Sequence, residues 1–258
     1  MTELPRYLIV GRGRWASRMQ TILIGEAREV SSLEQSRLAR SEEVLAYRAR
    51  LQSAFKASGA QIAWLCVPPG SHIPVMMEAA IESGLHVVVE KPWLCSAEDT
   101  HRLEALGKAR NTLLGIHYEY CLADQVEAWR REWNPGAGLR FGGRLNISRP
   151  NHTGLSALDN LGSHLFSIHE YCVPHSAIAE IDCDYGQLDE RRVWLGSQGR
   201  RIAEIDLLAN KEPIIQRFIA RVEAAIRGAD FPFGLQFALN VAERSALWQQ
   251  RAERRAQL

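Results

Sequence analysis

The sequence predicts an α/β protein in which a doubly wound parallel sheet is followed by a smaller α+β domain with a mostly antiparallel sheet. Three observations support this prediction. Short apolar runs alternate with helix-like segments from residue 6 to about residue 117, and a glycine-rich turn follows the first run directly. Beyond residue 118 the pattern changes to strands in which polar and apolar residues alternate. We therefore place one domain at 1–118 and another at 119–258.

Each predicted strand of the first domain is short and apolar, as in a sheet that helices cover on both faces. Strands are expected at 6–10, 28–35, 62–67, 86–90 and 112–116, with helices at about 15–24, 41–57, 72–83 and 96–109. Ser96 is the expected N-cap of the last helix, with Asp99 three residues later. Strands that alternate with helices pair in parallel through right-handed crossovers.

The second domain shows a different pattern. Helices are expected near 121–133, at 212–228 and at about 234–250, and strands at 139–149, 178–187, 191–197 and 201–208. Several of these strands alternate polar and apolar residues, which indicates an antiparallel sheet with one face in water. The segment 197–200, SQGR, is the expected turn between the last two strands.

The composition excludes several classes of protein. The chain has 258 residues, 46% of them hydrophobic, and a formal net charge of +1 with both signs mixed along it. This balance argues against a nucleic-acid-binding or anionic-membrane surface. No apolar run is long enough to span a membrane, and the N-terminus lacks the features of a secretion signal. The five cysteines are scattered without zinc-site spacing. We expect a cytoplasmic protein without a metal.

The run LHVVVEKPW, residues 85–93, is the most informative stretch. Its valines are typical of a strand buried on both faces, and the strand ends at Glu90. Pro92 cannot extend the strand because it lacks an N–H. Lys91 is therefore expected at the carboxyl end of a core strand, the edge where open parallel sheets bind ligands. The alternative is that Lys91 simply marks a solvated strand end.

The glycine-rich turn, residues 11–16, has the G-x-G-x-x-A form of a dinucleotide-binding fingerprint. Gly11 permits a tight turn, Gly13 lets the backbone approach a pyrophosphate, and Ala16 lets helix and strand pack closely. The helix that opens at Arg14 and Trp15 supplies N–H donors and the positive end of its dipole. Because the turn follows the first strand of a strand–helix alternation, it predicts a Rossmann domain that binds NAD(P) through these residues.

The sequence is equivocal about which dinucleotide binds. Glu34, at the end of the second strand, is positioned to accept a hydrogen bond from the 2′-hydroxyl of NAD. Ser36 and Arg37 lie about 20 residues beyond the fingerprint and are suited to a 2′-phosphate, which favours NADP. We expect NADP, with NAD as the alternative; a solvated helix start is the competing interpretation of Arg37.

Three motifs together, VGRGRW, CVPPGSH (66–72) and EKP (90–92), resemble the glucose-fructose oxidoreductase / inositol dehydrogenase / rhizopine-catabolism (Gfo/Idh/MocA) family in order and spacing across the N-terminal half. The resemblance implies that Pro68, Pro69 and His72 line the nicotinamide-ribose side. It also implies that Glu90 and Lys91 approach the nicotinamide and the substrate, where Lys91 donates to a carbonyl or takes part in proton transfer from a hydroxyl.

The segment 157–171, ALDNLGSHLFSIHEY, is similar to that family's aspartate-x-glycine-x-histidine helix. Gly162 and His164 match the glycine and the histidine, which commonly acts as general acid/base in the family. The aspartate position holds Asn160, with Asp159 immediately before it. Because asparagine cannot take a proton, three possibilities stay open: Asp159 substitutes, His164 works with Lys91 alone, or the site differs from that of a typical sugar dehydrogenase.

The family's polar motif after the last N-terminal strand appears here as residues 117–120, HYEY. Tyr118 is expected to contact the substrate or donate a proton; the alternative is that Tyr118 and Tyr120 pack between the domains. His152 and His169 are expected to be structural or at the surface. The second domain is shorter than is usual in the family, which predicts a smaller sheet.

We therefore predict an NAD(P)-dependent oxidoreductase that transfers hydride between nicotinamide and a small polyol, sugar or related carbonyl or imine substrate. In this hypothesis Lys91 polarises the substrate oxygen, His164 shuttles the proton, and Asn160 or Asp159 orients the histidine. The alternative is a cofactor-binding sensor or pseudoenzyme partner without turnover.

We also expect a homodimer or homotetramer, because members of this family usually associate through the exposed sheet face of the second domain. The strand patterns offer Phe141, Val193 and Trp194 for such a contact. The competing explanation is that a helix of the same domain covers these residues.

Overall fold

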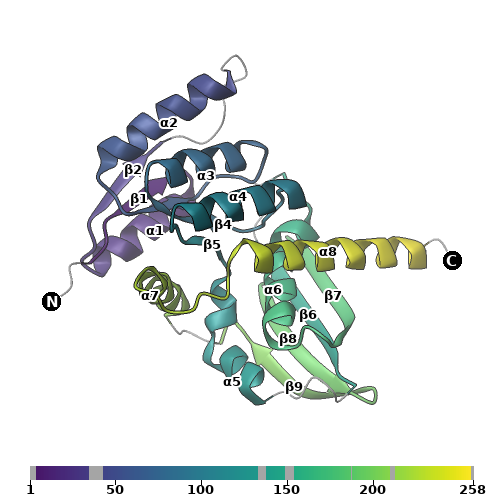
Figure 1. The fold of residues 1–258 in the computed structure, drawn as a ribbon. Helices are drawn as coiled ribbons and strands as arrows, with labels where there is room; N and C mark the ends of the chain where they lie inside the picture. Colours follow the sequence, from purple (N-terminus) through teal and green to yellow (C-terminus); the bar gives the residue numbers. More distant parts are fainter. Residues whose placement is uncertain are drawn as a thin grey trace. The chain divides into compact units, whose positions relative to one another are not determined.

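The computed structural model describes residues 4–34, 43–132, 138–148, 154–186, 188–209 and 213–256 (Figure 1). The chain divides into two compact units. The first comprises the chain up to His117 together with Ile219–Leu239, and the second comprises Tyr118–Phe218 and the chain from Asn240 onward. The division falls beside the predicted boundary, except that Ile219–Leu239 groups with the first unit instead of the second.

The first unit is built on a five-stranded parallel sheet in the order β2-β1-β3-β4-β5. Its strands are β1 (Tyr7–Val10), β2 (Val30–Leu33), β3 (Ile62–Leu65), β4 (His86–Glu90) and β5 (Leu114–His117). This arrangement confirms the predicted doubly wound domain. The strand order reverses between β1 and β3, so the topological switch point, where such sheets bind their ligands, lies at the carboxyl ends of these two strands.

Helices cover both faces of this sheet, as the short apolar strands predict. They are α1 (Arg14–Gly25), α2 (Val44–Ser58), α3 (His72–Glu82) and α4 (Ala97–Ala109). Helices α2, α3 and α4 lie side by side on one face, and α1 lies on the other (Figure 1). The predicted cap of α4 is confirmed, because the Ser96 hydroxyl accepts a hydrogen bond of 3.0 Å from the backbone N–H of Asp99.

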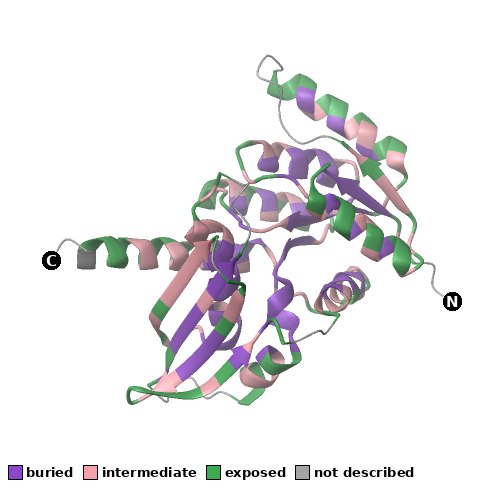
Figure 2. Cartoon of the chain, turned by 180° about the vertical axis from the view of Figure 1, so that it is seen from behind, coloured by how far each residue is buried: buried purple, intermediate pink, exposed green. Residues whose placement is uncertain are grey.

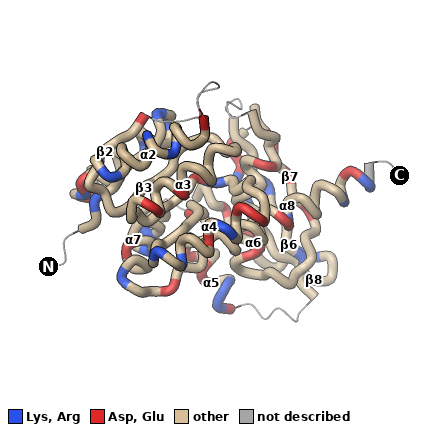
Figure 3. Tube along the Cα trace, turned by 45° about the horizontal axis from the view of Figure 1, so that its top comes forward, with Lys and Arg blue, Asp and Glu red and all other residues tan. Residues whose placement is uncertain are grey.

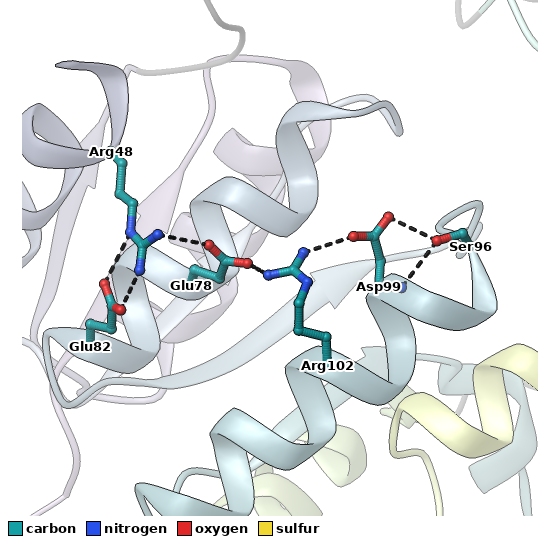
Figure 4. A network of polar contacts seen from close by, with 6 residues as sticks. All are labelled: Arg48, Glu78, Glu82, Ser96, Asp99 and Arg102. Carbon is teal, nitrogen blue, oxygen red and sulfur yellow. Dashed lines mark hydrogen bonds and ion pairs between the residues drawn. The ribbon is translucent and has the colours of Figure 1, made fainter. Parts of the chain in front are cut away.

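A chain of ion pairs links α2, α3 and α4 (Figure 4). Arg48 of α2 contacts Glu82 of α3 and lies 3.1 Å from a carboxylate oxygen of Glu78 on the same helix. Glu78 also pairs with Arg102 of α4, which binds Asp99 at 2.7 Å. Glu78 is buried, whereas both arginines are partly exposed to water, which screens the pairs, so the network supports the packing of these helices without dominating it.

The segment that returns to the first unit is held by specific contacts. Glu223, in α7 (Ile214–Ile226), accepts hydrogen bonds from the Tyr7 hydroxyl at 2.8 Å and from Arg28 Nε at 2.6 Å. Burial, together with Glu223, raises the pKa of the Tyr7 hydroxyl. Beyond the helix, the backbone N–H of Ile116 donates to the Phe233 carbonyl at 2.9 Å. These contacts explain why Ile219–Leu239 packs with the first unit.

The second unit contains a four-stranded mixed sheet in the order β7-β6-β8-β9. Its strands are β6 (Arg140–Ile147), β7 (Ala177–Tyr185), β8 (Glu190–Ser197) and β9 (Arg200–Asp206), and its helical segments include the 3₁₀ turn Glu119–Leu122, α5 (Asp124–Glu132), the π-helical turn Leu158–Gly162 and α6 (Ser163–Cys172). The pairs β6–β8 and β8–β9 are antiparallel, which confirms a small, mostly antiparallel sheet. Strands β6 and β7 pair in parallel, because α6 connects them as a crossover.

The last helix, α8 (Leu235–Ala256), extends beyond the residue near 250 where the sequence pattern placed its end. Within the second unit, Arg244 of α8 pairs with Glu170 of α6, and Asn240 donates to the same carboxylate at 3.0 Å. These polar contacts attach α8 to α6 within the second unit.

Phe141 and Val193 belong to the interior of the second unit, so the prediction that they form an inter-subunit contact is wrong. Figure 2 shows buried residues along the middle strands of this sheet. Phe141 and Val193 are both 0% exposed, and the Phe141 ring lies 5.2 Å from that of His169 on α6. We call the sheet face that carries Phe141 the inner face. The competing explanation, a covering helix of the same domain, is the one observed.

Trp194 lies on the opposite, outer face of the sheet and is also covered by its own chain. Its ring fills the space above Gly142, where a Cβ atom would come within 2.3 Å of the indole. The guanidinium of Arg201 stacks 4.1 Å from the ring centroid. Only 6% of Trp194 is exposed, so it too offers little apolar area to a second subunit.

Charges of both signs are interspersed over the described residues (Figure 3), in line with the mixed pattern of the sequence. Within the part of the chain that the structure describes, no helix is long and apolar enough to cross a membrane. In the same part, no group of three or more His, Cys, Asp or Glu side chains is arranged to hold a metal ion.

His169 is a core residue, as expected. It is 0% exposed, and its Nε2 lies 3.1 Å from both the carbonyl and the hydroxyl of Ser176. Burial, reinforced by the positive charge of Arg244, lowers the pKa of His169 to about 4. The imidazole is therefore neutral in the folded protein at neutral pH, where it serves packing.

Acid is expected to destabilise the second unit through His169. As the pH falls below the ordinary histidine pKa of 6.5 toward about 4, the unfolded chain takes up a proton that the folded chain refuses. The free energy of unfolding should therefore fall by about 2 kcal/mol between about pH 7.5 and about pH 5 from this residue alone. Urea unfolding at both pH values should show a smaller loss for His169→Gln, whereas His101→Gln, at an exposed position of α4, should behave like the wild type. An unchanged pH dependence in His169→Gln would contradict the assignment.

Candidate functional site

The turn after β1 is shaped by a close contact with the end of β3. Gly11 has a φ of +134°, and a Cβ atom there would lie 2.3 Å from the carbonyl oxygen of Cys66. No larger residue fits this position without moving the backbone. The glycine therefore lets the two strands at the switch point end side by side.

Gly13 is a glycine that the packing of the chain does not require. It is the N-cap of α1 with an ordinary extended conformation (φ −78°, ψ 170°), and a Cβ atom there would meet no atom within 4 Å. Open space beside the N-terminus of a helix suits the close approach of a pyrophosphate, which backbone N–H groups and the helix dipole favour. The residues at the fingerprint therefore fit a dinucleotide.

Arg14 and Trp15 begin α1 beside this space, as predicted. Arg14 is exposed, and Trp15 is half-buried with its ring 5.8 Å from that of His117. Ala16, the third position of the fingerprint, is 3% exposed, so it does allow the close packing of α1 on the sheet.

Glu90, at the end of β4, joins the ends of three neighbouring strands. Its carboxylate accepts a hydrogen bond of 2.8 Å from Trp64 Nε1 on β3 and lies 2.9 Å from His117 Nδ1 on β5. Burial alone would raise the pKa of Glu90, but His117, Trp64 and Trp15 together lower it below its usual value. A buried carboxylate in this state holds its neighbours in fixed orientations.

Sequence reasoning placed His117 in the motif 117–120 without giving it a role, and it did not identify Trp64 as a site residue. The strand register pairs Glu90 with His117 directly, and both lie at the carboxyl edge of the sheet. The sequence does show that His117 ends the strand that follows β4 in the chain. That His117 lies opposite Glu90 could be inferred only from the pairing of β4 with β5 and its register.

Lys91 follows β4 immediately and is half-buried. The peptide bond between Lys91 and Pro92 is cis. Across the same edge, Pro68 is exposed, Pro69 is half-buried and His72 is the first residue of α3. The structure thus gathers the predicted nucleotide-side residues of the first unit at one edge of its sheet.

Two of the predicted cofactor contacts, Ser36 and Arg37, lie outside the described residues, as does His152. Glu34, the other candidate reader of the ribose, follows the end of β2 and is exposed. The choice between NAD and NADP stays a prediction.

Asp159 takes part in a helix cap. Its carboxylate accepts a 2.6 Å hydrogen bond from the Ser156 hydroxyl, which in turn accepts one of 3.0 Å from the backbone N–H of Asp159. Gln249 donates to the other carboxylate oxygen at 3.0 Å. The Ser156 hydroxyl therefore caps the backbone N–H of Asp159 at the start of the helical segment, and the Asp159 carboxylate holds that hydroxyl in place. These hydrogen bonds give Asp159 a structural role. That role is distinct from the predicted one, in which Asp159 replaces the family aspartate at position 160.

Asn160 and His164 are placed by the helical segment that follows. Asn160, in the π-helical turn, donates a hydrogen bond to the hydroxyl of Tyr185 at the end of β7. His164, in α6, is 7% exposed, and its ring meets the ring of Tyr120 edge-on at 4.7 Å. Arg191 of β8 donates to the Tyr120 hydroxyl. Sequence reasoning did not predict that Tyr185 and Arg191 belong to this cluster.

Tyr118 is 1% exposed, and burial, together with Cys121, raises the pKa of its hydroxyl. The phenol is therefore protonated at neutral pH, which is compatible with the predicted role of donor and incompatible with that of a base. Lys91 belongs to the first unit, whereas Tyr118, Asp159, Asn160 and His164 belong to the second.

Comparison with known proteins supports the fingerprint. Residues 6–118 match the model of the family described as "Oxidoreductase family, NAD-binding Rossmann fold" (GFO_IDH_MocA). A curated relative, the uncharacterized oxidoreductase YfiI of Bacillus subtilis, is 26% identical over 69 residues, which is 27% of this chain and 17% of that protein. The chain thus matches less than a fifth of the length of this relative.

Solved structures resemble the chain over nearly its full length. A putative oxidoreductase from Magnetospirillum magnetotacticum superposes with a TM-score of 0.71 at 16% identity, covering 95% of this chain and 99% of that one. UDP-N-acetylglucosamine 3-dehydrogenase GnnA from Acidithiobacillus ferrooxidans gives 0.73 at 15% identity, covering 94% and 96%. The WlbA dehydrogenase from Bordetella pertussis, solved with NADH and UDP-GlcNAcA, gives 0.71 at 15% identity, covering 97% of each chain. At such identities the likeness shows a shared fold.

Proposed function

We propose that the chain is a member of the Gfo/Idh/MocA family of NAD-binding oxidoreductases, whose model its residues 6–118 match, and that it is a dehydrogenase or reductase acting on a small sugar, polyol or related carbonyl compound. The observation that carries the proposal is the space beside Gly13, which the packing of the chain leaves open at the N-terminus of α1. Lys91, at the carboxyl edge of the same sheet, supplies the polar group that the chemistry needs. Two relatives of the same fold support a sugar derivative as substrate, since they are dehydrogenases named or solved with UDP-sugars.

The chemistry divides between the cofactor and the chain. When bound, the nicotinamide supplies or accepts the hydride. Lys91 donates a hydrogen bond to the substrate oxygen and stabilises the charge that develops there. In the second unit, His164 is the candidate group for proton exchange, and Asn160 contributes hydrogen bonds without taking up a proton. Glu90 holds His117 and Trp64 in place at the end of the sheet.

A second candidate function is a dinucleotide-binding sensor without turnover. One specific observation favours it: Asn160 occupies the position of the family aspartate, while Asp159 is engaged with Ser156 and Gln249. This candidate shares the cofactor site and lacks the hydride transfer. Self-association as a homodimer or homotetramer, and a cytoplasmic location, remain predictions.

Binding and turnover test the proposal together. Quenching of protein fluorescence by NADH and by NADPH measures whether the dinucleotide binds, and absorbance of the reduced cofactor then follows turnover with a panel of sugars, polyols, keto compounds and imines. We expect saturable binding and turnover with at least one member of the panel. Binding without any turnover would favour the sensor, and an absence of binding would overturn both candidates.

The same titration decides which dinucleotide the enzyme prefers. We expect NADPH to bind more tightly than NADH, with Arg37→Ala weakening NADPH by about tenfold, because an arginine–phosphate contact is charge-assisted. Glu34→Gln is the matched variant for NADH, because Glu34 is the candidate acceptor for the 2′-hydroxyl of NAD. If Glu34→Gln weakens NADH while Arg37→Ala changes neither affinity, the ribose is read by the glutamate and the preference for NADP is wrong.

A further inference from the structure

Arg191 lies on the apolar face of the sheet in the second unit. Its partner in register is Leu145 of β6, which is 1% exposed. Side chains alternate along a strand, so Arg191 shares the inner face with Val193 and Leu195, both 0% exposed. An arginine among these residues breaks the alternation that otherwise places charge on the outer face.

The guanidinium of Arg191 has few partners in the protein. One Nη donates to the Tyr120 hydroxyl, and the group lies 5.9 Å from the centroid of that ring. Its Nε is buried, and within the described part of the chain it meets no hydrogen-bond acceptor. Among the same described residues, no carboxylate forms an ion pair with Arg191.

The next residue shows the contrast. Arg192 points to the outer face, is more exposed, and pairs with Glu204 at 3.5 Å and with Glu190 at 3.7 Å. The exposed Arg192 therefore has carboxylate partners on β8 and β9, whereas Arg191, on the inner face, has none among the described residues. Because a partly desolvated charge without a counter-ion costs free energy, its retention at this position calls for a ligand that supplies the negative charge.

The neighbours of Arg191 connect it to the candidate proton-transfer group. The Tyr120 ring, whose hydroxyl accepts from Arg191, packs edge-on against His164. We propose that Arg191 binds an anionic group of the substrate, a carboxylate or a phosphate, and so selects an acidic sugar derivative over a neutral one. This inference rests on the proposed function, since it concerns the substrate of the same enzyme. The planar fork of the guanidinium matches either group with two parallel hydrogen bonds.

The test compares matched probes on the NADH-loaded protein by isothermal titration calorimetry. The probes are D-glucose, D-glucuronate and D-glucose 6-phosphate, with acetate and inorganic phosphate as the bare anions. We expect at least one anionic probe to bind about tenfold or more tightly than glucose, and to lose about tenfold in affinity in Arg191→Met, because hydrogen bonds between a guanidinium and an anion are charge-assisted. Preferential binding of glucuronate and acetate would indicate a carboxylate site. Preferential binding of glucose 6-phosphate and inorganic phosphate would indicate a phosphate site.

Arg192→Met is the matched control, since it removes a charge from the same strand on the other face, and it should bind every probe as the wild type does. Arg191→Lys keeps the charge without the fork and should restore part of the lost affinity, provided that thermal unfolding shows both variants folded. If no anionic probe is preferred over glucose, or if Arg191→Met binds them as tightly as the wild type, the inference is overturned and Arg191 only positions Tyr120. Unchanged NADH affinity in Arg191→Met separates this failure from a failure of the proposed function.

Discussion

Lys91→Ala is expected to lower kcat/KM by about 10²–10⁴-fold while the affinity for the reduced dinucleotide stays within about twofold of the wild type. The lysine follows β4 directly, at the edge where Glu90 joins β3, β4 and β5. Its ammonium group acts on the oxygen of the substrate, where charge develops during hydride transfer, so its removal affects the transition state more than the binding of the cofactor. Steady-state kinetics with the best substrate of the panel, together with a fluorescence titration of the cofactor, measure the two quantities separately.

Two further variants sharpen the result for Lys91. Lys108→Ala removes a lysine from an exposed position of α4 and should leave both quantities unchanged. Lys91→Arg keeps the positive charge but changes its geometry, and it should recover only part of the rate. If Lys91→Ala turns over at the wild-type rate, the lysine is a solvated strand end, and the proton chemistry belongs elsewhere.

The first unit could be predicted almost completely because local and global patterns agree there. The valines of β4, the glycine at position 11 and the capping serine of α4 each report a backbone requirement that the residue itself carries. Gly11 carries such a requirement, because a Cβ atom at this position would lie 2.3 Å from the carbonyl oxygen of Cys66. The return of Ile219–Leu239 to this unit was not predictable, because the buried partner of Glu223 is Tyr7, which is far away in the sequence.

The second unit was harder because an alternating strand does not say which face is covered. The pattern around Phe141 and Val193 indicates one apolar face, but only the structure shows that α6 covers it. Arg191 was missed for the same reason, since in the sequence an arginine beside Arg192 is indistinguishable from one more exposed charge, and only the register with Leu145 places it on the inner face.

Asp159 is a different case, because the sequence contained the information. Ser156 and Asp159 have the spacing of a capping box, the same spacing that correctly identified Ser96 and Asp99 at the start of α4. Applying that rule at residue 156 predicts a structural task for Asp159. Whether Asp159 also takes the role of the family aspartate stays a prediction.

Gly11→Ala and Gly13→Ala are expected to differ strongly in their effect on stability. At Gly11 the new methyl group meets the Cys66 carbonyl oxygen, and the φ of +134° is unfavourable for any residue with a Cβ atom. We expect the free energy of unfolding to fall by roughly 3 kcal/mol or more. At Gly13 the backbone is ordinary and the methyl group meets nothing within 4 Å, but alanine is a poorer N-cap than glycine, which offsets the gain through the unfolded state, so stability should stay within about 1 kcal/mol of the wild type.

The effect of Gly13→Ala on the cofactor separates function from folding. The methyl group would occupy the space that the packing of the chain leaves open beside the N-terminus of α1, where a pyrophosphate is expected to approach the backbone. NADH should therefore bind about tenfold or more weakly to a protein that is about as stable as the wild type. Chemical unfolding and a fluorescence titration on the same samples measure both quantities. Wild-type affinity in Gly13→Ala would show that the dinucleotide does not pass this glycine, and wild-type stability in Gly11→Ala would contradict the contact with β3.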